Sequence, residues 1–148
     1  MTVQPDVVLV HLRITGVLFA LLVAVHAFVP GRLRWRDELP RLSLVNRQIF
    51  EVHTIFIVLV LGLLSALLLI AGDTLLEPTR LSRAVLVGLL VFWGLRMLMQ
   101  WFYYSPAIWR GHRFNTLAHC AFSALWVYVT ATFTAALWTN IAGGRVIP

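Results

Sequence analysis

The sequence predicts an all-α integral membrane protein, folded as an antiparallel up-down bundle of four transmembrane helices. The chain has 148 residues, of which 60% are hydrophobic, and a soluble domain of this size cannot bury so much apolar surface. The apolar residues fall into four long runs, each able to cross about 30 Å of hydrocarbon at about 1.5 Å per residue. Short connections between the runs force neighbouring helices to alternate in direction.

Glycine, proline and short polar residues mark the limits of each predicted helix. The helices cover residues 7–29, 48–71, 82–104 and 114–142. They end at Pro30-Gly31, Gly72-Asp73, Ser105-Pro106 and Gly143-Gly144, respectively. The first run has neither a basic region before it nor a small-residue cleavage pattern after it, so we expect it to be retained as a helix. We expect residues 1–148 to form one domain.

The longest connection, residues 30–47, mixes arginines with leucines and Trp35, which favours a short segment lying in the membrane interface. Arginines also predict the orientation, because basic residues gather on the cytoplasmic side. The connections 30–47 and 105–113 hold or border seven of them: Arg32, Arg34, Arg36, Arg41, Arg47, Arg110 and Arg113. The other side holds Arg13, Arg80, Arg83 and Arg145. We therefore expect a multi-pass cell-membrane protein with both termini outside the cytoplasm.

Charge and cysteine content limit the kinds of partner, disulfide and metal site that the chain can have. The net charge is +6, and all twelve basic residues are arginines that lie mostly between the apolar runs. This placement indicates contact with anionic membrane lipids, and no nucleic acid is expected as a partner. Cys120 is the only cysteine, so the chain cannot form an intrachain disulfide or a thiolate metal cluster by itself.

Small residues are spaced for close helix packing on two of the runs. Gly16, Ala20 and Ala24 recur every four residues on the first, and Gly62 and Ala66 do so on the second. Such a stripe allows the backbone of another helix to approach closely. We expect both stripes to serve packing.

Several ionisable residues lie within the apolar runs, where a charged group is costly and marks a functional site by default. They are His26, Glu51, His53, Arg96 and His119, with Gln100 and Tyr103 as polar neighbours. Each of the four helices brings at least one of them to a similar distance from the arginine-rich connections, as an antiparallel bundle requires. The sequence therefore predicts one polar layer drawn from four helices.

The 100° helical step predicts which side chains face inward. On the third helix Arg96, Gln100 and Tyr103 share a face, and on the fourth helix a polar track runs from His119 along the segment. Glu51 lies about 160° from His53 around the second helix. We expect it to meet a neighbouring helix, a subunit or lipid headgroups. The Glu-x-His spacing also differs from the i, i+3 pattern of di-iron carboxylate bundles.

Histidines at one depth suggest a cofactor, because imidazole ligates haem iron and other metals. His26, His53 and His119 are the candidate ligands for haem b or another metal, and Arg96 and Tyr103 are candidates to border a cofactor or quinone pocket. In helix count and histidine depth the chain resembles the small membrane-anchor cytochromes b. That resemblance implies haem and quinone between helices.

Three functions remain open from the sequence. The first is an electron-transfer subunit that binds haem b, another metal or quinone through the polar layer. The second is a non-catalytic accessory subunit of a larger respiratory or photosynthetic complex, packed against other membrane subunits or copies of itself. The third is a small lipid- or quinone-modifying enzyme. No nucleophile, metalloprotease or P-loop motif is present, which favours a subunit over an independent enzyme.

Overall fold

The structure is a computed structural model that describes residues 4–144. Arg145, which entered the comparison of charges on the two sides, lies outside the described residues. The chain divides into two compact units. The first combines the residues up to Leu12 with those from Gly72 onward, and the second comprises Arg13–Ala71.

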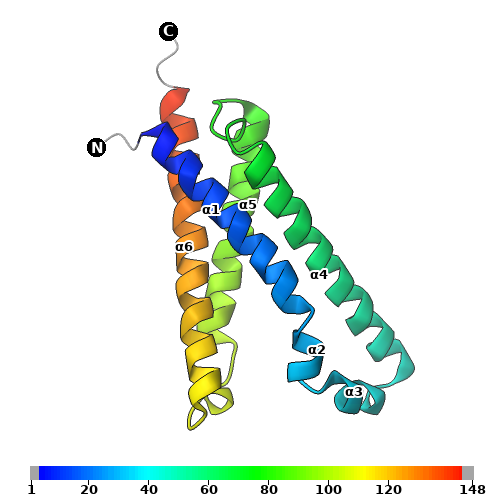
Figure 1. Ribbon diagram of the computed structural model, residues 1–148. Helices are drawn as coiled ribbons and strands as arrows, with labels where there is room; N and C mark the ends of the chain where they lie inside the picture. Colours follow the sequence, from blue (N-terminus) through cyan, green and yellow to red (C-terminus); the bar gives the residue numbers. More distant parts are fainter. Residues whose placement is uncertain (1–3, 145–148) are drawn as a thin grey trace. The chain divides into compact units, whose positions relative to one another are not determined.

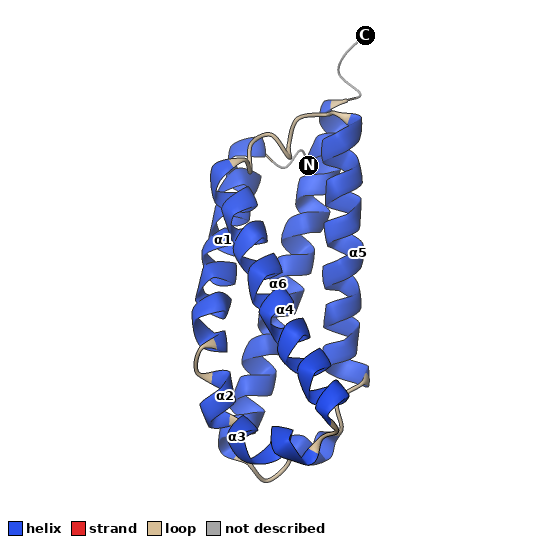
Figure 2. Cartoon of the chain, turned by 90° about the vertical axis from the view of Figure 1, so that its right-hand side faces the viewer, coloured by secondary structure: helices blue, strands red, loops and turns tan. Residues whose placement is uncertain are grey.

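Four helices are long and apolar enough to cross a membrane: α1 Pro5–His26, α4 Leu44–Ile70, α5 Arg80–Phe102 and α6 Arg113–Gly143. They confirm the four predicted runs within a few residues at each end. Between residues 4 and 144 the chain contains helices, turns and loops and no strand, as Figure 2 shows. The all-helical class and the four candidate spans are therefore as the sequence predicts.

Capping explains where the helix limits differ from the hydrophobic pattern. α1 ends at His26, before 29, because Pro30 cannot continue a helix and instead occupies the first turn of the short helix α2, Val29–Arg32. α4 begins at Leu44, before 48, because the Ser43 hydroxyl accepts a hydrogen bond from the backbone N–H of Asn46 at 3.4 Å. A proline can thus end a helix before its apolar run ends, and a polar capping residue can start a helix before its apolar run begins.

The 30–47 connection consists of short helical pieces. After α2 come α3, Trp35–Glu38, and the 3-10 turn η1, Leu39–Arg41. Arg34, before α3, adopts the left-handed backbone region with φ 53° and ψ 40°, which reverses the chain between the two short helices. A second 3-10 turn, η2 Pro106–Ile108, lies between α5 and α6.

In the second unit, α1 and α4 meet most closely at Gly16. The Ser65 hydroxyl donates to the Gly16 carbonyl oxygen at 2.8 Å. A Cβ atom on Gly16 would lie 2.9 Å from Leu69 Cγ and 3.2 Å from Leu68 Cβ, so only glycine fits without displacement. The predicted close approach is confirmed at Gly16. At Gly62 an added Cβ would meet no described atom within 4 Å, so the close approach expected there stays a prediction.

In the first unit, α5 and α6 lie side by side (Figure 1). Their shared core is built from large apolar residues: Leu86, Leu89, Trp93, Trp126, Val129 and Phe133. Near the end of α6, Asn140 is fully buried and donates to the carbonyl oxygens of Leu75 and Glu77 and to the Ser82 hydroxyl. Asn140 thereby fixes the 72–79 connection against α6.

Candidate functional site

Two helices of the first unit bring Arg96, Gln100 and His119 together. Arg96 and Gln100 lie one turn apart on α5, and His119 lies in the second turn of α6. Arg96 Nη1 donates to Gln100 Oε1 at 3.2 Å, and Gln100 Nε2 lies 2.9 Å from His119 Nδ1. Gln100 is 6% exposed, and the other two side chains are half-buried. The structure thus joins three polar residues that the sequence placed at one depth.

The chemistry of the groups fixes the direction of both hydrogen bonds. A guanidinium group has only N–H donors, so the amide oxygen of Gln100 faces Arg96 and its NH₂ group faces His119. His119 Nδ1 then accepts, and the neutral ring carries its proton on Nε2. We call this chain of hydrogen bonds the Arg96–Gln100–His119 relay. It ends in an Nε2–H group that can donate to a further acceptor.

Aromatic rings lie against both ends of the relay. The indole of Trp109 stacks on the His119 imidazole, with 3.9 Å between ring centroids and 12° between the planes. At the other end, Arg96 Cζ lies 4.8 Å from the ring centroid of Trp126. The ring of Tyr104 lies 5.9 Å from the same guanidinium carbon. These rings give the relay flat apolar surroundings and hold the arginine charge through cation–π contacts.

The polar track predicted on α6 continues from His119 through Ser123, Trp126 and Thr130. Trp126 is 5% exposed and stacks on Trp93 with 5.1 Å between ring centroids. Within the part of the chain that the structure describes, the Ser123 and Thr130 hydroxyls and the Trp126 indole nitrogen are buried without a hydrogen-bond partner. Buried polar groups are nearly always paired with protein, water or a ligand. The track therefore offers three polar groups to a bound molecule or to water.

His26 and His53 lie in the second unit and share one local geometry. Nδ1 of His26 lies 2.7 Å from the carbonyl oxygen of Leu22, and Nδ1 of His53 lies 2.8 Å from that of Ile49. A carbonyl oxygen only accepts, so Nδ1 carries the proton and Nε2 of each neutral ring keeps a lone pair. Metal-ligating histidines are usually oriented in this way by a second hydrogen bond. His26 is half-buried and His53 is exposed.

The three candidate ligands thus adopt two different tautomers. His26 and His53 present a lone pair on Nε2, whereas His119 presents an N–H donor. Ligation of a metal through His119 Nε2 would require the ring to change tautomer and lose its bond to Gln100. Among residues 4–144, no group of three or more His, Cys, Asp or Glu side chains is gathered around a common point.

Tyr103 lies at the C-terminal end of α5. It is the C-cap residue of α5, is 77% exposed, and its ring meets Tyr104 edge-on with 6.0 Å between centroids. Its backbone keeps right-handed helical dihedral angles, φ −91° and ψ −41°, and its N–H donates to the Met99 carbonyl oxygen. α5 ends at Phe102, and it is the Tyr104 ring that lies near the arginine.

Two aromatic residues of this site have roles that the sequence analysis did not assign. Trp126 belongs to the polar track, and its spacing of seven residues from His119 places both on one side of α6. Trp109 lies in the connection before α6, where helical periodicity says nothing about which ring it meets. Only the folded connection reveals its stacking on His119.

In comparisons with known proteins, the chain matches no family model, no curated protein and no solved structure.

Proposed function

We propose that this chain is an integral membrane subunit of an electron-transfer complex, folded as an up-down bundle of four transmembrane helices. The length and apolar character of α1, α4, α5 and α6 support membrane insertion. The excess of arginine at connections 30–47 and 105–113 supports a cytoplasmic location for these loops and an external location for both termini.

The Arg96–Gln100–His119 relay is the observation on which the functional proposal rests. Its terminal His119 Nε2–H group is suited to donate to a carbonyl oxygen of a quinone. The half-buried ring of Trp109, which stacks on His119, is suited to the flat apolar body of such a ligand. Reduction of a quinone places negative charge on its oxygens, and the Arg96 charge stabilises it through the polarised amide of Gln100.

The proposal extends to haem b, or another histidine-ligated metal, bound in the second unit. His26 and His53 supply the support, because each keeps an Nε2 lone pair while its Nδ1–H is held by a backbone carbonyl. His119 is assigned to the quinone and not to the metal, since its hydrogen bond with Gln100 gives it the opposite tautomer. Tyr103, exposed at the C-terminal end of α5, stays a candidate to border the quinone pocket.

Quinone binding is tested by titrating a short-chain quinone into the detergent-purified protein and following tryptophan fluorescence. His119→Phe removes the donor and keeps a ring against Trp109, so we expect affinity to fall about tenfold, the upper range for one neutral hydrogen bond. His112→Phe is the matched control, because His112 is exposed and caps α6 without a side-chain hydrogen bond. Equal affinity of both variants, or no quinone binding by the wild type, contradicts this assignment.

Haem binding is tested by the optical spectrum of the same preparation. We expect a Soret band that is lost in His26→Ala and in His53→Ala and retained in His119→Phe. A colourless protein without stoichiometric iron, copper or zinc would remove the metal from the proposal and leave the quinone site standing.

The charge of Arg96 is tested separately from the histidines. Arg96→Leu removes the cation that polarises the relay, and Arg13→Leu makes the same change at an exposed position on α1. We expect the Arg96 variant to retain less cofactor and to assemble less well than the Arg13 variant. If the two variants retain cofactor and assemble equally well, Arg96 has no special role in cofactor binding or assembly.

A second candidate function is that of a non-catalytic accessory subunit of a larger respiratory or photosynthetic complex. The observation that favours it is that most of α4 is uncovered: of its 27 residues, the buried ones are Leu61, Ser65 and Leu68. Such an apolar surface suits partner helices as well as lipid. Copurification of other membrane subunits at fixed stoichiometry with a colourless, quinone-free chain would favour this candidate over the first.

A further inference from the structure

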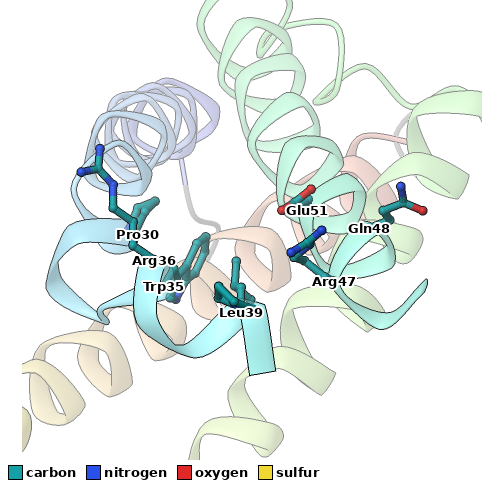
Figure 3. Close-up of a pocket in the computed structure, with 8 residues that line it drawn as sticks. Pro30, Trp35, Arg36, Leu39, Arg47, Gln48 and Glu51 are labelled. Atoms are coloured by element: carbon teal, nitrogen blue, oxygen red, sulfur yellow. The ribbon is translucent and has the colours of Figure 1, made fainter. Parts of the chain in front are cut away.

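The connection between α1 and α4 forms a pocket of about 420 Å³ with the beginning of α4, entirely within the second unit. Eight residues line it: Pro30, Trp35, Arg36, Leu39, Pro40, Arg47, Gln48 and Glu51. Figure 3 shows Arg47 and Glu51 next to each other on α4, with Trp35 and Leu39 across from them. The pocket thus combines basic, acidic and apolar walls.

The charges in this pocket are not used by the protein itself. Among the described residues, Arg36, Arg47 and Glu51 make no ion pair and no side-chain hydrogen bond, although Arg47 and Glu51 are one turn apart on α4. Four other charged residues of the connection pair with each other: Arg34 with Asp37 at 3.1 Å, and Arg41 with Glu38 at 3.6 Å. Arg47 and Glu51, which lie next to each other, therefore leave one cation and one carboxylate for a ligand that carries both signs of charge.

Apolar surface lies beside these charges. The ring of Trp35 is held edge-on against Phe50, with 4.8 Å between centroids and 80° between planes. On α4, Ile55 and Leu59 follow Glu51 at successive turns and are 65% and 51% exposed. A ligand with a charged head in the pocket can therefore extend an apolar chain along α4. This combination is typical of a membrane lipid and not of a small water-soluble metabolite.

We infer that this pocket binds the headgroup of a phospholipid whose head carries a phosphate and a primary ammonium group, as in phosphoethanolamine lipids. Arg47 binds the phosphate, for which a guanidinium fork is suited. The ammonium group donates to the Glu51 carboxylate. An anionic headgroup without an amine meets repulsion from Glu51, and a quaternary choline has no N–H to donate. The inference gives Glu51 a role and is independent of the quinone and haem sites.

The test compares lipid retention by the purified full-length chain in native mass spectrometry, using phosphatidylethanolamine, phosphatidylglycerol and phosphatidylcholine with identical acyl chains. We expect the wild type to prefer the ethanolamine lipid. Glu51→Gln should weaken ethanolamine-lipid binding about tenfold, as expected for a lost charge-assisted hydrogen bond, without weakening the glycerol lipid. Arg47→Gln should weaken both, because both carry the phosphate.

Glu38→Gln and Arg41→Gln are the matched controls. They make the same charge changes in the same connection, but these exposed residues do not line the pocket. Both controls should bind the ethanolamine lipid as the wild type does. Equal lipid preference in the wild type and Glu51→Gln, or loss of binding in Glu38→Gln as large as in Glu51→Gln, would overturn the inference.

A photoactivatable ethanolamine lipid provides a measurement on the unmodified protein, so that the test does not depend on a variant that folds. We expect cross-links within the pocket-lining residues, suppressed by excess ethanolamine lipid and less by glycerol lipid. Cross-links spread evenly over α4, α5 and α6 would indicate bulk lipid and overturn the inference. Displacement by soluble glycerophosphoethanolamine at the same concentration would identify a free metabolite as the ligand and overturn the lipid assignment.

Discussion

Replacing Gln100 by leucine breaks the relay at its centre. The substitution keeps a buried side chain of similar size and removes two hydrogen bonds, the 3.2 Å bond from Arg96 and the 2.9 Å bond to His119. Hydrogen bonds between transmembrane helices contribute about 0.6 kcal/mol on average and up to about 1.7 kcal/mol. Because one of the two bonds has a charged donor, we expect Gln100→Leu to lower the free energy of unfolding by about 1–3 kcal/mol.

Gln4→Leu is the control, since it makes the same change at an exposed position before α1. Surface substitutions of this kind usually change stability by less than about 0.5 kcal/mol. The assay is equilibrium unfolding in mixed micelles, with the tryptophan fluorescence as the signal, because Trp109 and Trp126 lie beside the relay. If Gln100→Leu is as stable as Gln4→Leu, then the relay is not a buried hydrogen-bonded element and the reasoning about its direction fails.

Two further substitutions test packing and polar contacts elsewhere. Gly16→Ala places a Cβ 2.9 Å from Leu69 Cγ and should lower the free energy of unfolding by about 1–3 kcal/mol in the same assay. Gly62→Ala is the control and should not destabilise the protein, because its added Cβ has no described atom within 4 Å. Equal effects of the two substitutions would refute the close approach at Gly16. Asn140→Leu takes the side-chain donor from the Leu75 carbonyl oxygen and removes the bonds to Glu77 and Ser82, so it should lower the free energy of unfolding by about 2–3 kcal/mol. Asn115→Leu, which removes one exposed bond to a carbonyl, should cost much less.

The four long helices were predictable because a bilayer imposes a strong and simple constraint on length and apolar character. Their limits were less predictable, since Ser43 and Pro30 act through local backbone chemistry that adds polar residues to a helix or removes apolar ones. Both glycine stripes looked alike in the sequence. Of the two glycines, Gly16 lies against Leu68 and Leu69 of α4, and Gly62 has no described atom near its Cβ position, because spacing shows which residues share a face and not whether a neighbour covers it.

For the candidate site, the sequence predicted the polar residues and their depth but not the direction of their hydrogen bonds. The helical step placed Arg96 and Gln100 on one face, and both do meet at 3.2 Å. It could not show that His119 faces an amide while His26 and His53 face backbone carbonyls, because ring tautomers depend on the partner atom. That difference separates the proposed quinone donor from the proposed metal ligands.

The tautomers of the histidines provide the most direct test of this account. Nitrogen-15 NMR of the histidine-labelled protein distinguishes a ring protonated on Nδ1 from one protonated on Nε2, and the signals are assigned by single replacement of His26, His53 and His119. We predict that neutral His119 carries its proton on Nε2, and that neutral His26 and His53 carry theirs on Nδ1. A His119 signal protonated on Nδ1 would contradict the Arg96–Gln100–His119 relay and the quinone site proposed from it.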